Sequence, residues 1–216
     1  MGSPPSIRLL PHRVPPGILD PVVRALARLG VTPNALSTTG FAGNVAAGAF
    51  AAGGWFFAAG AATLAASALD LLDGGLARAT GRVTRFGAVY DSVLDRLSEA
   101  AVLAGLLFHF TSGDDAVMAG VIFAATVGSV MVSYVRARAQ GVGADLREGL
   151  FTRAERVLLM GAALIIGAAW APAVTIALWT LAVVANLTAI QRLIAARQAL
   201  RGDGEASPTT PDGGAP

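Results

Sequence analysis

Six stretches of about 20 mostly apolar residues divide this chain, and their length limits what it can fold into. A helix of about 20 residues crosses the hydrocarbon core of a bilayer, which is roughly 30 Å thick. Hydrophobic residues make up 54% of the 216 residues and charged residues 14%, a more apolar balance than ordinary soluble domains have. The sequence predicts an all-α, polytopic membrane protein with six transmembrane helices, at residues 34–52, 55–79, 87–110, 115–139, 155–170 and 173–195.

The segments outside these six stretches differ in composition. Residues 18–29 place leucine, isoleucine and valine at helical spacing with arginines on the other face, which predicts an amphipathic helix in the headgroup region, capped by Asp20 and Pro21. The last residues are rich in Gly, Pro, Ser and Thr and offer too little apolar surface to fold. The predicted organisation is a cytoplasmic N-terminal segment with an interfacial helix (1–30), a six-helix transmembrane domain (31–200) and a disordered C-terminal tail (201–216).

The distribution of arginine predicts the orientation. The chain has 16 basic residues, all arginine, and none lies in the short connections after residues 52, 110 and 170. By the positive-inside rule the arginine-bearing side faces the cytosol, so we expect a multi-pass protein of the cell membrane with both termini and the active site cytoplasmic. The excess positive charge then reflects topology and contact with anionic membrane lipids, and no nucleic-acid partner is expected. A lysine-free chain rich in alanine and glycine also suits a high-GC bacterium.

Four aspartates lie at the arginine-bearing ends of the second and third predicted helices. Asp70 and Asp73 are three residues apart and Asp91 and Asp95 four apart, so each pair shares one helix face. Carboxylates gathered in this way repel one another unless cations compensate them. The chain has no cysteine and only two histidines, so one or two hard cations with oxygen ligands, Mg²⁺ or Mn²⁺, fit best. Glu99 continues the second face by one turn, where it could orient a metal ligand or an arginine, or simply bond to a neighbouring helix.

Two glycines follow the first aspartate pair. Gly74 and Gly75 interrupt a predicted helix at about 1 kcal/mol each relative to alanine, which indicates close approach of a bulky ligand to the backbone. Arg78 lies one turn beyond Gly74 and offers a fixed fork of donors for phosphate.

A second group of arginines opens the fifth predicted helix. Thr152 and Glu155 have the spacing of a capping box, which gives Glu155 a structural role. Arg153 and Arg156 oppose the helix dipole there, which would be explained by an anion bound between them, with Arg192 completing the pocket. These arginines could equally lie at the cytosolic membrane surface and contact lipid phosphates.

The aspartate region resembles the signature of the CDP-alcohol phosphatidyltransferases. The pattern D-x2-D-G-x2-A-R-x8-G-x3-D-x3-D is matched at every fixed position, by Asp70, Asp73, Gly74, Ala77, Arg78, Gly87, Asp91 and Asp95. The resemblance covers roughly residues 30–195. Members of this family are integral membrane enzymes, usually homodimers, which displace CMP from a CDP-linked lipid or alcohol with a second alcohol.

The resemblance implies a role for each matched residue. Two metal ions, Mg²⁺ or Mn²⁺, would bind Asp70, Asp73, Asp91 and Asp95, and Asp95 would also be the base that takes the acceptor's proton. The donor, CDP-diacylglycerol, would contact Asn34, Gly74, Arg78 and Thr84. Asn34 and Thr84 could instead be no more than a helix-start residue and a turn hydroxyl.

A further resemblance concerns the acceptor. The motifs SYVRARA, R-x-E-R and QR occur in the same order as in the actinobacterial phosphatidylinositol phosphate synthases of this family, whose acceptor is inositol phosphate. The resemblance implies that Arg136, Arg153 and Arg192 hold the acceptor phosphate. The chain departs from that group at Arg136, where lysine is common, and at Ala154, where proline is common.

Two other interpretations stay open on the sequence. The first keeps the enzyme family but takes glycerol phosphate or phosphatidylglycerol as acceptor, which would make the chain a phosphatidylglycerophosphate or cardiolipin synthase. The second is a divalent-cation transporter that uses the acids as its filter. Against it, the four acids cluster toward one side and no comparable polar track continues through the other halves of the predicted helices.

Overall fold

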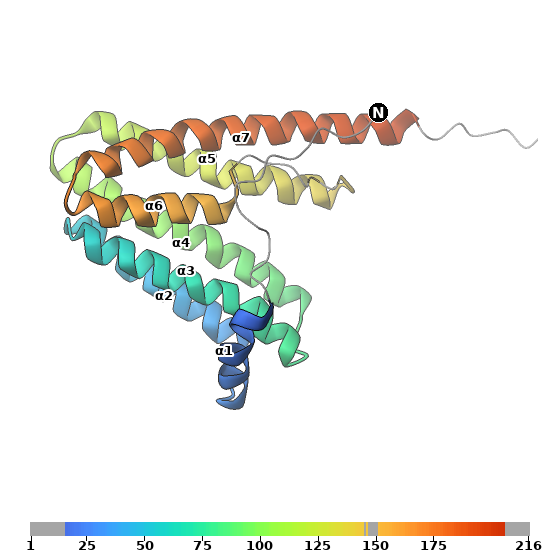
Figure 1. The fold of residues 1–216 in the computed structure, drawn as a ribbon. Helices are drawn as coiled ribbons and strands as arrows, with labels where there is room; N and C mark the ends of the chain where they lie inside the picture. The colour runs from blue at the N-terminus through green and yellow to red at the C-terminus, as the bar shows by residue number, and fades with distance from the viewer. Residues whose placement is uncertain (1–15, 145, 147–150, 206–216) are drawn as a thin grey trace, which may run out of the picture.

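The structure, a computed structural model, is helical throughout the part of the chain that it describes, residues 16–144, 146 and 151–205 (Figure 1). No strand occurs among these residues, which confirms the all-α prediction for them. In chain order the helices are α1 (Pro16–Arg28), α2 (Pro33–Ala52), α3 (Phe56–Ala79), α4 (Arg85–Ser112), α5 (Ala116–Gly141), α6 (Arg153–Gly167) and α7 (Pro172–Glu205).

The six segments predicted to cross the membrane all form helices, α2 to α7, and the predicted ends of α2 to α6 lie close to the observed ones. The exception is α7, which continues past residue 195 to Glu205 and so enters the segment predicted as a tail. The remainder of that tail, residues 206–216, lies outside the described residues.

The N-terminal helix begins earlier than expected. The predicted start at Asp20 and Pro21 is wrong, because α1 begins at Pro16 and Pro21 lies inside the helix. Proline is favoured in the first turn of a helix, and in α1 the proline in that position is Pro16 instead of Pro21. Residues 1–15 of the predicted N-terminal segment are not among those described.

Three of the described helices, α3, α5 and α7, are long and apolar enough to cross a membrane by length and composition. The α6 helix has 15 residues and is therefore about 22 Å long, shorter than a full span of hydrocarbon. Exposed side chains on the long helices are often large and apolar, as at Phe57, Phe123 and Trp179. Such a broad apolar surface is typical of proteins that contact lipid.

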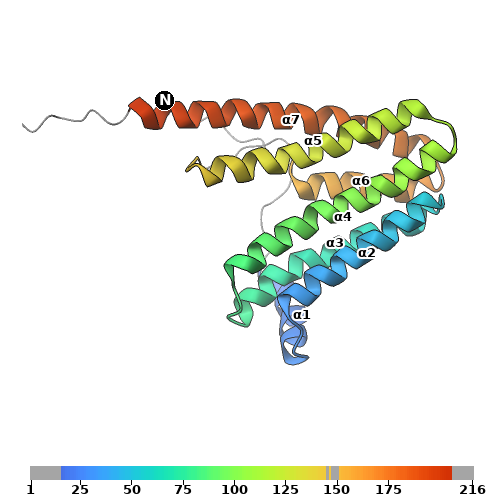
Figure 2. The same ribbon diagram turned by 180° about the vertical axis from the view of Figure 1, so that it is seen from behind.

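The helices form two groups of three. Helices α2, α3 and α4 pack together, α7 packs against α5 and α6, and the groups meet where α3 contacts α6 and α4 contacts α5 (Figures 1 and 2). The α1 helix packs on α3 and projects away from the bundle. The core between the groups is built of fully buried aliphatic side chains that include Leu106, Ile122, Leu164 and Leu178.

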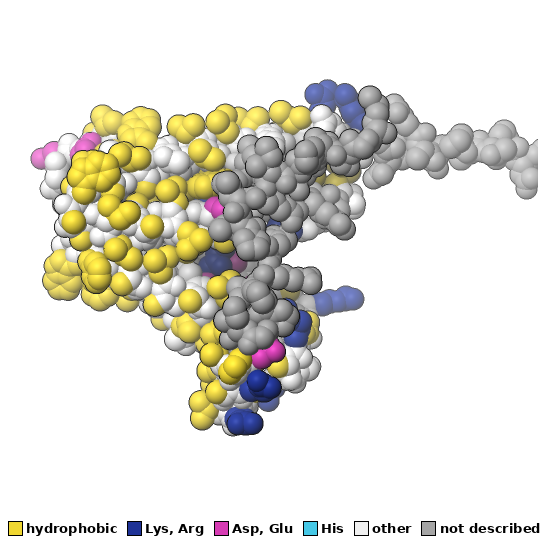
Figure 3. All heavy atoms as spheres, in the orientation of Figure 1, with side chains coloured by type: hydrophobic (Ala, Val, Ile, Leu, Met, Phe, Trp, Pro, Cys, Tyr) yellow, Lys and Arg dark blue, Asp and Glu magenta, His cyan; other side chains and the backbone are white. Residues whose placement is uncertain are grey.

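Consecutive helices run in opposite directions, so the connections separate into two ends. The short connections α2–α3, α4–α5 and α6–α7 lie at one end, and α1 with the α3–α4 connection lies at the other (Figure 1). Arginine side chains gather at the second end, while apolar side chains cover the body of the bundle (Figure 3). The arginine pattern read from the sequence therefore corresponds to one end of the folded bundle.

Three of the helices that start at that end, α2, α4 and α6, each have a threonine at the N-cap. Thr32 accepts a hydrogen bond from the N–H of Ala35 at the start of α2, and Thr84 accepts one from the N–H of Gly87 at the start of α4. Thr152 precedes α6, where its own N–H donates to Glu155 at 2.5 Å. These contacts confirm the capping role predicted for Glu155 and fix where α2, α4 and α6 begin.

Glycines allow the helices to approach closely. A Cβ atom on Gly105 of α4 would lie 2.0 Å from the carbonyl oxygen of Gly48 on α2, and one on Gly60 of α3 would lie 2.6 Å from the carbonyl oxygen of Gly161 on α6. Both neighbours are backbone atoms, which cannot move aside as a side chain can. Helix contacts of this kind between small residues are typical of membrane bundles.

The contact at Gly105 makes a stability prediction. Because Gly105→Ala forces α2 and α4 apart, it should destabilise the protein by about 2–3 kcal/mol, measured by unfolding of the purified protein in detergent. Gly120→Ala is the matched control, because a Cβ atom on Gly120 would meet nothing within 4 Å. The control should be neutral or gain about 0.5–1 kcal/mol, since alanine favours the helix. Equal stability of the two variants would contradict the close α2–α4 contact.

Candidate active site

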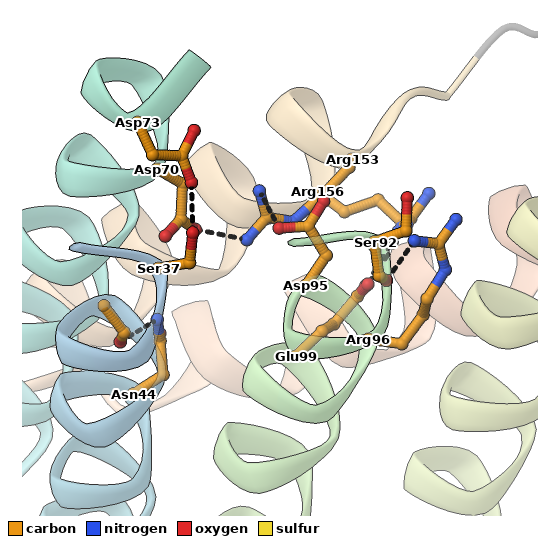
Figure 4. Close-up of polar contacts among 11 residues, drawn as sticks. Ser37, Asn44, Asp70, Asp73, Ser92, Asp95, Arg96, Glu99, Arg153 and Arg156 are labelled. Carbon is orange, nitrogen blue, oxygen red and sulfur yellow. Dashed lines mark hydrogen bonds and ion pairs between the residues drawn. The ribbon is translucent and has the colours of Figure 1, made fainter. Parts of the chain in front are cut away.

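Two helices bring the four aspartates together at the arginine-bearing end of the bundle. Asp70 and Asp73 come from α3 and Asp91 and Asp95 from α4. Asp91 lies close enough to Asp73 and Asp95 for electrostatic repulsion between their carboxyl groups, and Asp95 lies close enough to Asp70 for the same repulsion. Figure 4 shows Asp70 and Asp73 facing Asp95 across the site. The fold therefore brings both predicted aspartate pairs to the same end of the bundle, with Asp73 and Asp91 on the wall of one cavity.

The guanidinium group of Arg153 lies between the two aspartate pairs. Its Nη2 atom is 2.5 Å from Oδ2 of Asp70, and its Nη1 atom is 2.9 Å from Oδ1 of Asp95 (Figure 4). The Asp70 side chain is only 8% exposed, so its charge has little access to water. The first turn of α6 thus supplies the positive charge that balances one carboxylate from α3 and one from α4.

The α2 helix forms the wall of the site beside the first aspartate pair. Asp73, which is buried, accepts a hydrogen bond from the hydroxyl of Ser37 at 2.6 Å. A Cβ atom on Gly40 would lie 2.5 Å from Oδ1 of Asp70, so only glycine leaves room for that carboxylate. The sequence alone did not assign Ser37 or Gly40 to this site. Their spacing of three residues on α2 was the available signal, but it is common in helices.

The donor groups suit a divalent cation of the Mg²⁺ or Mn²⁺ type, because carboxylate oxygens are the ligands such cations prefer. A cationic group already lies between Asp70 and Asp95, which indicates that this space favours positive charge. Within the described ranges, no three acidic or imidazole side chains converge as a ready-made metal-binding group. For Asp70 and Asp95 to hold a cation together, Arg153 would have to move out from between them.

A cavity of about 310 Å³ opens on one side of the aspartates, between α2, α3 and α4. All four residues predicted to contact the donor line it, namely Asn34, Gly74, Arg78 and Thr84. Asp73 and Asp91 also line this cavity. The residues that the resemblance assigned to one ligand are therefore brought to one place.

Several of these residues have structural roles as well. Thr84 is the N-cap of α4, so its predicted alternative as a turn hydroxyl is present in the structure. Asn34 lies in the first turn of α2, where its side chain points toward Gly87. The helix continues through Gly74 and Gly75, and a Cβ atom on Gly75 would meet Val23 of α1 at 3.3 Å. Gly75 thus serves helix packing, while Gly74 lines the cavity.

A second cavity, of about 380 Å³, lies on the other side of Asp95. It is strongly basic, since the three predicted acceptor residues line it together with two further arginines: Arg96, Arg136, Arg153, Arg156 and Arg192. Two acids, Asp95 and Glu99, also line it, together with neutral polar side chains that include Ser92, Ser133, Gln140 and Thr152. The sequence analysis missed Arg96, which directly follows Asp95 and donates to the carbonyl oxygen of Ser92.

Arg192 is held rigidly at the rim of this basic cavity. Its side chain is buried, and its Nη1 atom donates to the carbonyl oxygen of Val132 on α5 at 2.7 Å. Among the described residues its Nε atom has no hydrogen-bond partner. A buried cation with an unused donor indicates a place where an anion would be stabilised.

Arg156 does not have the free anion-binding role that the sequence predicted. Its Nε and Nη2 atoms donate to the two oxygens of Glu99 at 2.7 and 2.8 Å, and its Nη1 atom donates to the carbonyl oxygen of Phe151. The negative charge expected near the start of α6 is therefore supplied partly by the carboxylate of Glu99. Of the roles considered for Glu99, a bond to a neighbouring helix is the one observed, and its partner there is Arg156.

Comparisons with known proteins agree with this geometry. A family model described as CDP-alcohol phosphatidyltransferase matches residues 30–191. The phosphatidylinositol phosphate synthase of Mycobacterium marinum is 35% identical over 191 residues, which cover 82% of this chain and 78% of that protein. A crystal structure of the Mycobacterium tuberculosis phosphatidylinositol phosphate synthase with CDP-DAG bound has a TM-score of 0.80 at 30% identity, covering 90% of this chain and 99% of that one. A structure of the M. tuberculosis enzyme with manganese and citrate also has a TM-score of 0.80 at 30% identity, with 89% and 93% covered.

The Glu99–Arg156 pair makes a second stability prediction. Glu99→Leu leaves the Arg156 guanidinium, which is 2% exposed, without its counter-charge and should destabilise the protein by about 3–5 kcal/mol. Arg156→Met should destabilise the protein by a similar amount, because it leaves the carboxylate of Glu99 without its counter-charge. The double variant Glu99→Leu/Arg156→Met removes both charges and should be more stable than either single variant, measured by unfolding in detergent. Simple addition of the two single effects in the double variant would contradict a direct pair.

Proposed function

The chain belongs to the CDP-alcohol phosphatidyltransferase family, and from this premise we propose that it is a phosphatidylinositol phosphate synthase. In this reaction the phosphatidyl group moves from CDP-diacylglycerol to inositol phosphate. A bond forms between an acceptor hydroxyl oxygen and phosphorus, and the bond from that phosphorus to CMP breaks. CMP leaves with the electron pair, and the hydroxyl proton passes to a base.

One observation carries this proposal. Two cavities of different character adjoin the same aspartate cluster, with Asp73 and Asp91 on the first and Asp95 on the second. A transfer between two substrates needs both to reach the same catalytic groups from separate binding sites. The basic second cavity fits an acceptor that carries a phosphate, as inositol phosphate does.

The first cavity is proposed to bind the cytidine diphosphate group of the donor. Arg78 is exposed at its wall and would contact the diphosphate with its fork of N–H donors. Gly74 keeps the α3 side of this cavity free of a side chain. Asn34 and Thr84, from the starts of α2 and α4, would supply polar contacts. Binding of CDP-DAG by the M. tuberculosis enzyme of the same fold supports this assignment.

The second cavity is proposed to bind the acceptor through its phosphate. Arg136, Arg153 and Arg192 approach it from three different helices, α5, α6 and α7. Guanidinium groups match the geometry of phosphate oxygens, so such a triangle would fix the phosphate and aim the acceptor hydroxyls toward Asp95. Arg136 replaces the lysine common in this group of enzymes and keeps the positive charge.

Asp95 is proposed as the base that accepts the proton of the acceptor hydroxyl, because it is the aspartate that lines the acceptor cavity. Asp70, Asp73, Asp91 and Asp95 would hold two divalent cations, Mg²⁺ or Mn²⁺. When bound, such cations neutralise the charge that develops on the transferred phosphoryl group and on the leaving CMP. The manganese complex of the M. tuberculosis enzyme supports a divalent metal in this fold.

The membrane arrangement is part of the proposal. We propose that α2 to α7 form the transmembrane domain, that α1 lies at the interface, and that the arginine-bearing end with the active site faces the cytosol. The gathering of arginines at one end of the bundle supports this orientation. A homodimer, usual in the family, is also proposed.

The acceptor is tested by supplying the purified protein with CDP-diacylglycerol and Mg²⁺ and measuring CMP release with different acceptors. Inositol phosphate should give a kcat/KM about 100-fold above that of glycerol phosphate or phosphatidylglycerol, because the polar groups of the cavity are then all paired. Equal CMP release with glycerol phosphate would instead favour a phosphatidylglycerophosphate synthase. Cation flux into liposomes without any CMP release would favour the transporter.

The base is tested with Asp95→Asn. This variant removes the proton acceptor and one candidate metal ligand, so turnover should fall at least about 100-fold while binding of CDP-diacylglycerol is largely kept. Asp114→Asn is the matched control, since Asp114 lies in the α4–α5 connection at the other end and its positive φ angle suits asparagine. The control should keep its turnover, whereas near-normal turnover of Asp95→Asn would refute the assignment.

A further inference from the structure

Arg153 has two sets of candidate partners that compete for the same atoms. Its Nη1 and Nη2 atoms are both engaged by carboxylates, Asp95 on α4 and Asp70 on α3. The same side chain lines the basic cavity, where it is proposed to contact the acceptor phosphate. A guanidinium group has five N–H donors in one plane, two on each Nη atom and one on Nε, and here the carboxylates of Asp70 and Asp95 engage both Nη atoms and hold the group toward the aspartates.

The bridged position is also incompatible with a cation on these carboxylates. A divalent ion bound to Asp70 or Asp95 would have the guanidinium charge within a few ångströms, where like charges repel strongly at a site partly shielded from water. The Nε atom of Arg153 is buried and has no partner among the described residues, so the bridged position leaves one donor unsatisfied. The two ion pairs therefore hold Arg153 in a position that a bound metal ion would make unfavourable.

Once displaced, Arg153 would need another anion. The cavity beside it is lined by Arg96, Arg136 and Arg192, and Glu99, which also lines it, is already paired with the Nε and Nη2 atoms of Arg156. Moving one more free guanidinium into this cavity is unfavourable unless a negatively charged molecule enters with it. A phosphate-bearing acceptor is such a molecule.

We propose that Arg153 is an exchangeable internal cation. It balances Asp70 and Asp95 in the observed arrangement, and divalent metal and acceptor phosphate displace it together, so the two ligands bind with positive coupling through this side chain. The identity of the acceptor in this scheme rests on the proposed function. Competition between Arg153 and the metal does not depend on the acceptor. The reciprocity of binding linkage requires that the metal strengthen acceptor binding by the same factor.

The test measures Mn²⁺ binding, by the loss of the electron paramagnetic resonance signal of free Mn²⁺, to the full chain purified in detergent and freed of metal. With the wild-type protein, saturating inositol phosphate should tighten Mn²⁺ binding about tenfold. Arg153→Gln should bind Mn²⁺ about tenfold more tightly than the wild type without any acceptor, because no internal cation competes. Inositol phosphate should then add little further tightening.

Arg192→Gln is the matched control for general charge effects. It removes a positive charge from the same basic cavity, but Arg192 bonds to the carbonyl oxygen of Val132 and not to an aspartate. Its Mn²⁺ affinity without acceptor should stay within about twofold of the wild type, while its affinity for inositol phosphate falls. The same gain in Mn²⁺ affinity for Arg192→Gln as for Arg153→Gln would overturn the proposal, because the effect would then be non-specific.

A second variant keeps the test valid if Arg153→Gln is poorly folded. Arg153→Lys retains the charge but cannot bridge two carboxylates with a planar fork, so its Mn²⁺ affinity should lie between those of the wild type and of a variant without the charge. Unchanged Mn²⁺ affinity in a folded Arg153 variant that still releases CMP would overturn the exchange. Absence of CMP release with inositol phosphate, with Mn²⁺ competition intact, would refute the proposed acceptor but not the competition.

Discussion

The structure depends on balancing four carboxylates at one end of an apolar bundle. Charged groups near hydrocarbon are unfavourable unless paired, and here two of them, Asp70 and Asp95, are balanced by a single guanidinium from another helix. The hydroxyl of Ser37 on α2 donates a hydrogen bond to Asp73, which stabilises that carboxylate without adding charge. Because these partners come from α2, α3, α4 and α6, the balance exists only when all four helices are packed in register.

That register is set by close helix contacts lower in the bundle. Gly48 and Gly105 bring α2 against α4, and Gly60 and Gly161 bring α3 against α6, each at a distance that no Cβ atom would allow. The Glu99–Arg156 pair then ties α4 to α6 one turn below Asp95 and Arg153. Small residues in the apolar region and one buried ion pair thus determine how the polar end is assembled, although none of the glycines touches a substrate cavity.

The sequence predicted the helices well because apolar length and N-caps are local properties. The capping role of Glu155 could be assigned from its neighbours alone, and the aspartate spacing places each pair on one helix face whatever the rest of the fold. Which arginine meets which acid is a property of helix packing. Arg156 was expected to help bind an external anion, yet it faces Glu99 on α4, a residue 57 positions earlier in the chain. Ser37, Gly40 and Arg96 were missed for the same reason, since nothing local distinguishes them from ordinary helix residues.

The two cavities also show where selectivity must lie. The arginines of the basic cavity explain attraction for a phosphate group, but inositol phosphate and glycerol phosphate carry that group alike, so the arginines cannot separate them. Discrimination has to come from the neutral polar side chains on the same wall, Ser92, Ser133, Gln140 and Thr152. A ring of hydroxyls can pair with such groups, whereas a smaller acceptor leaves some of them unpaired, and unpaired polar groups in a closed site are unfavourable. In the proposed reaction, charge would attract the phosphate group of the acceptor, and the uncharged part of the wall would select the alcohol attached to it.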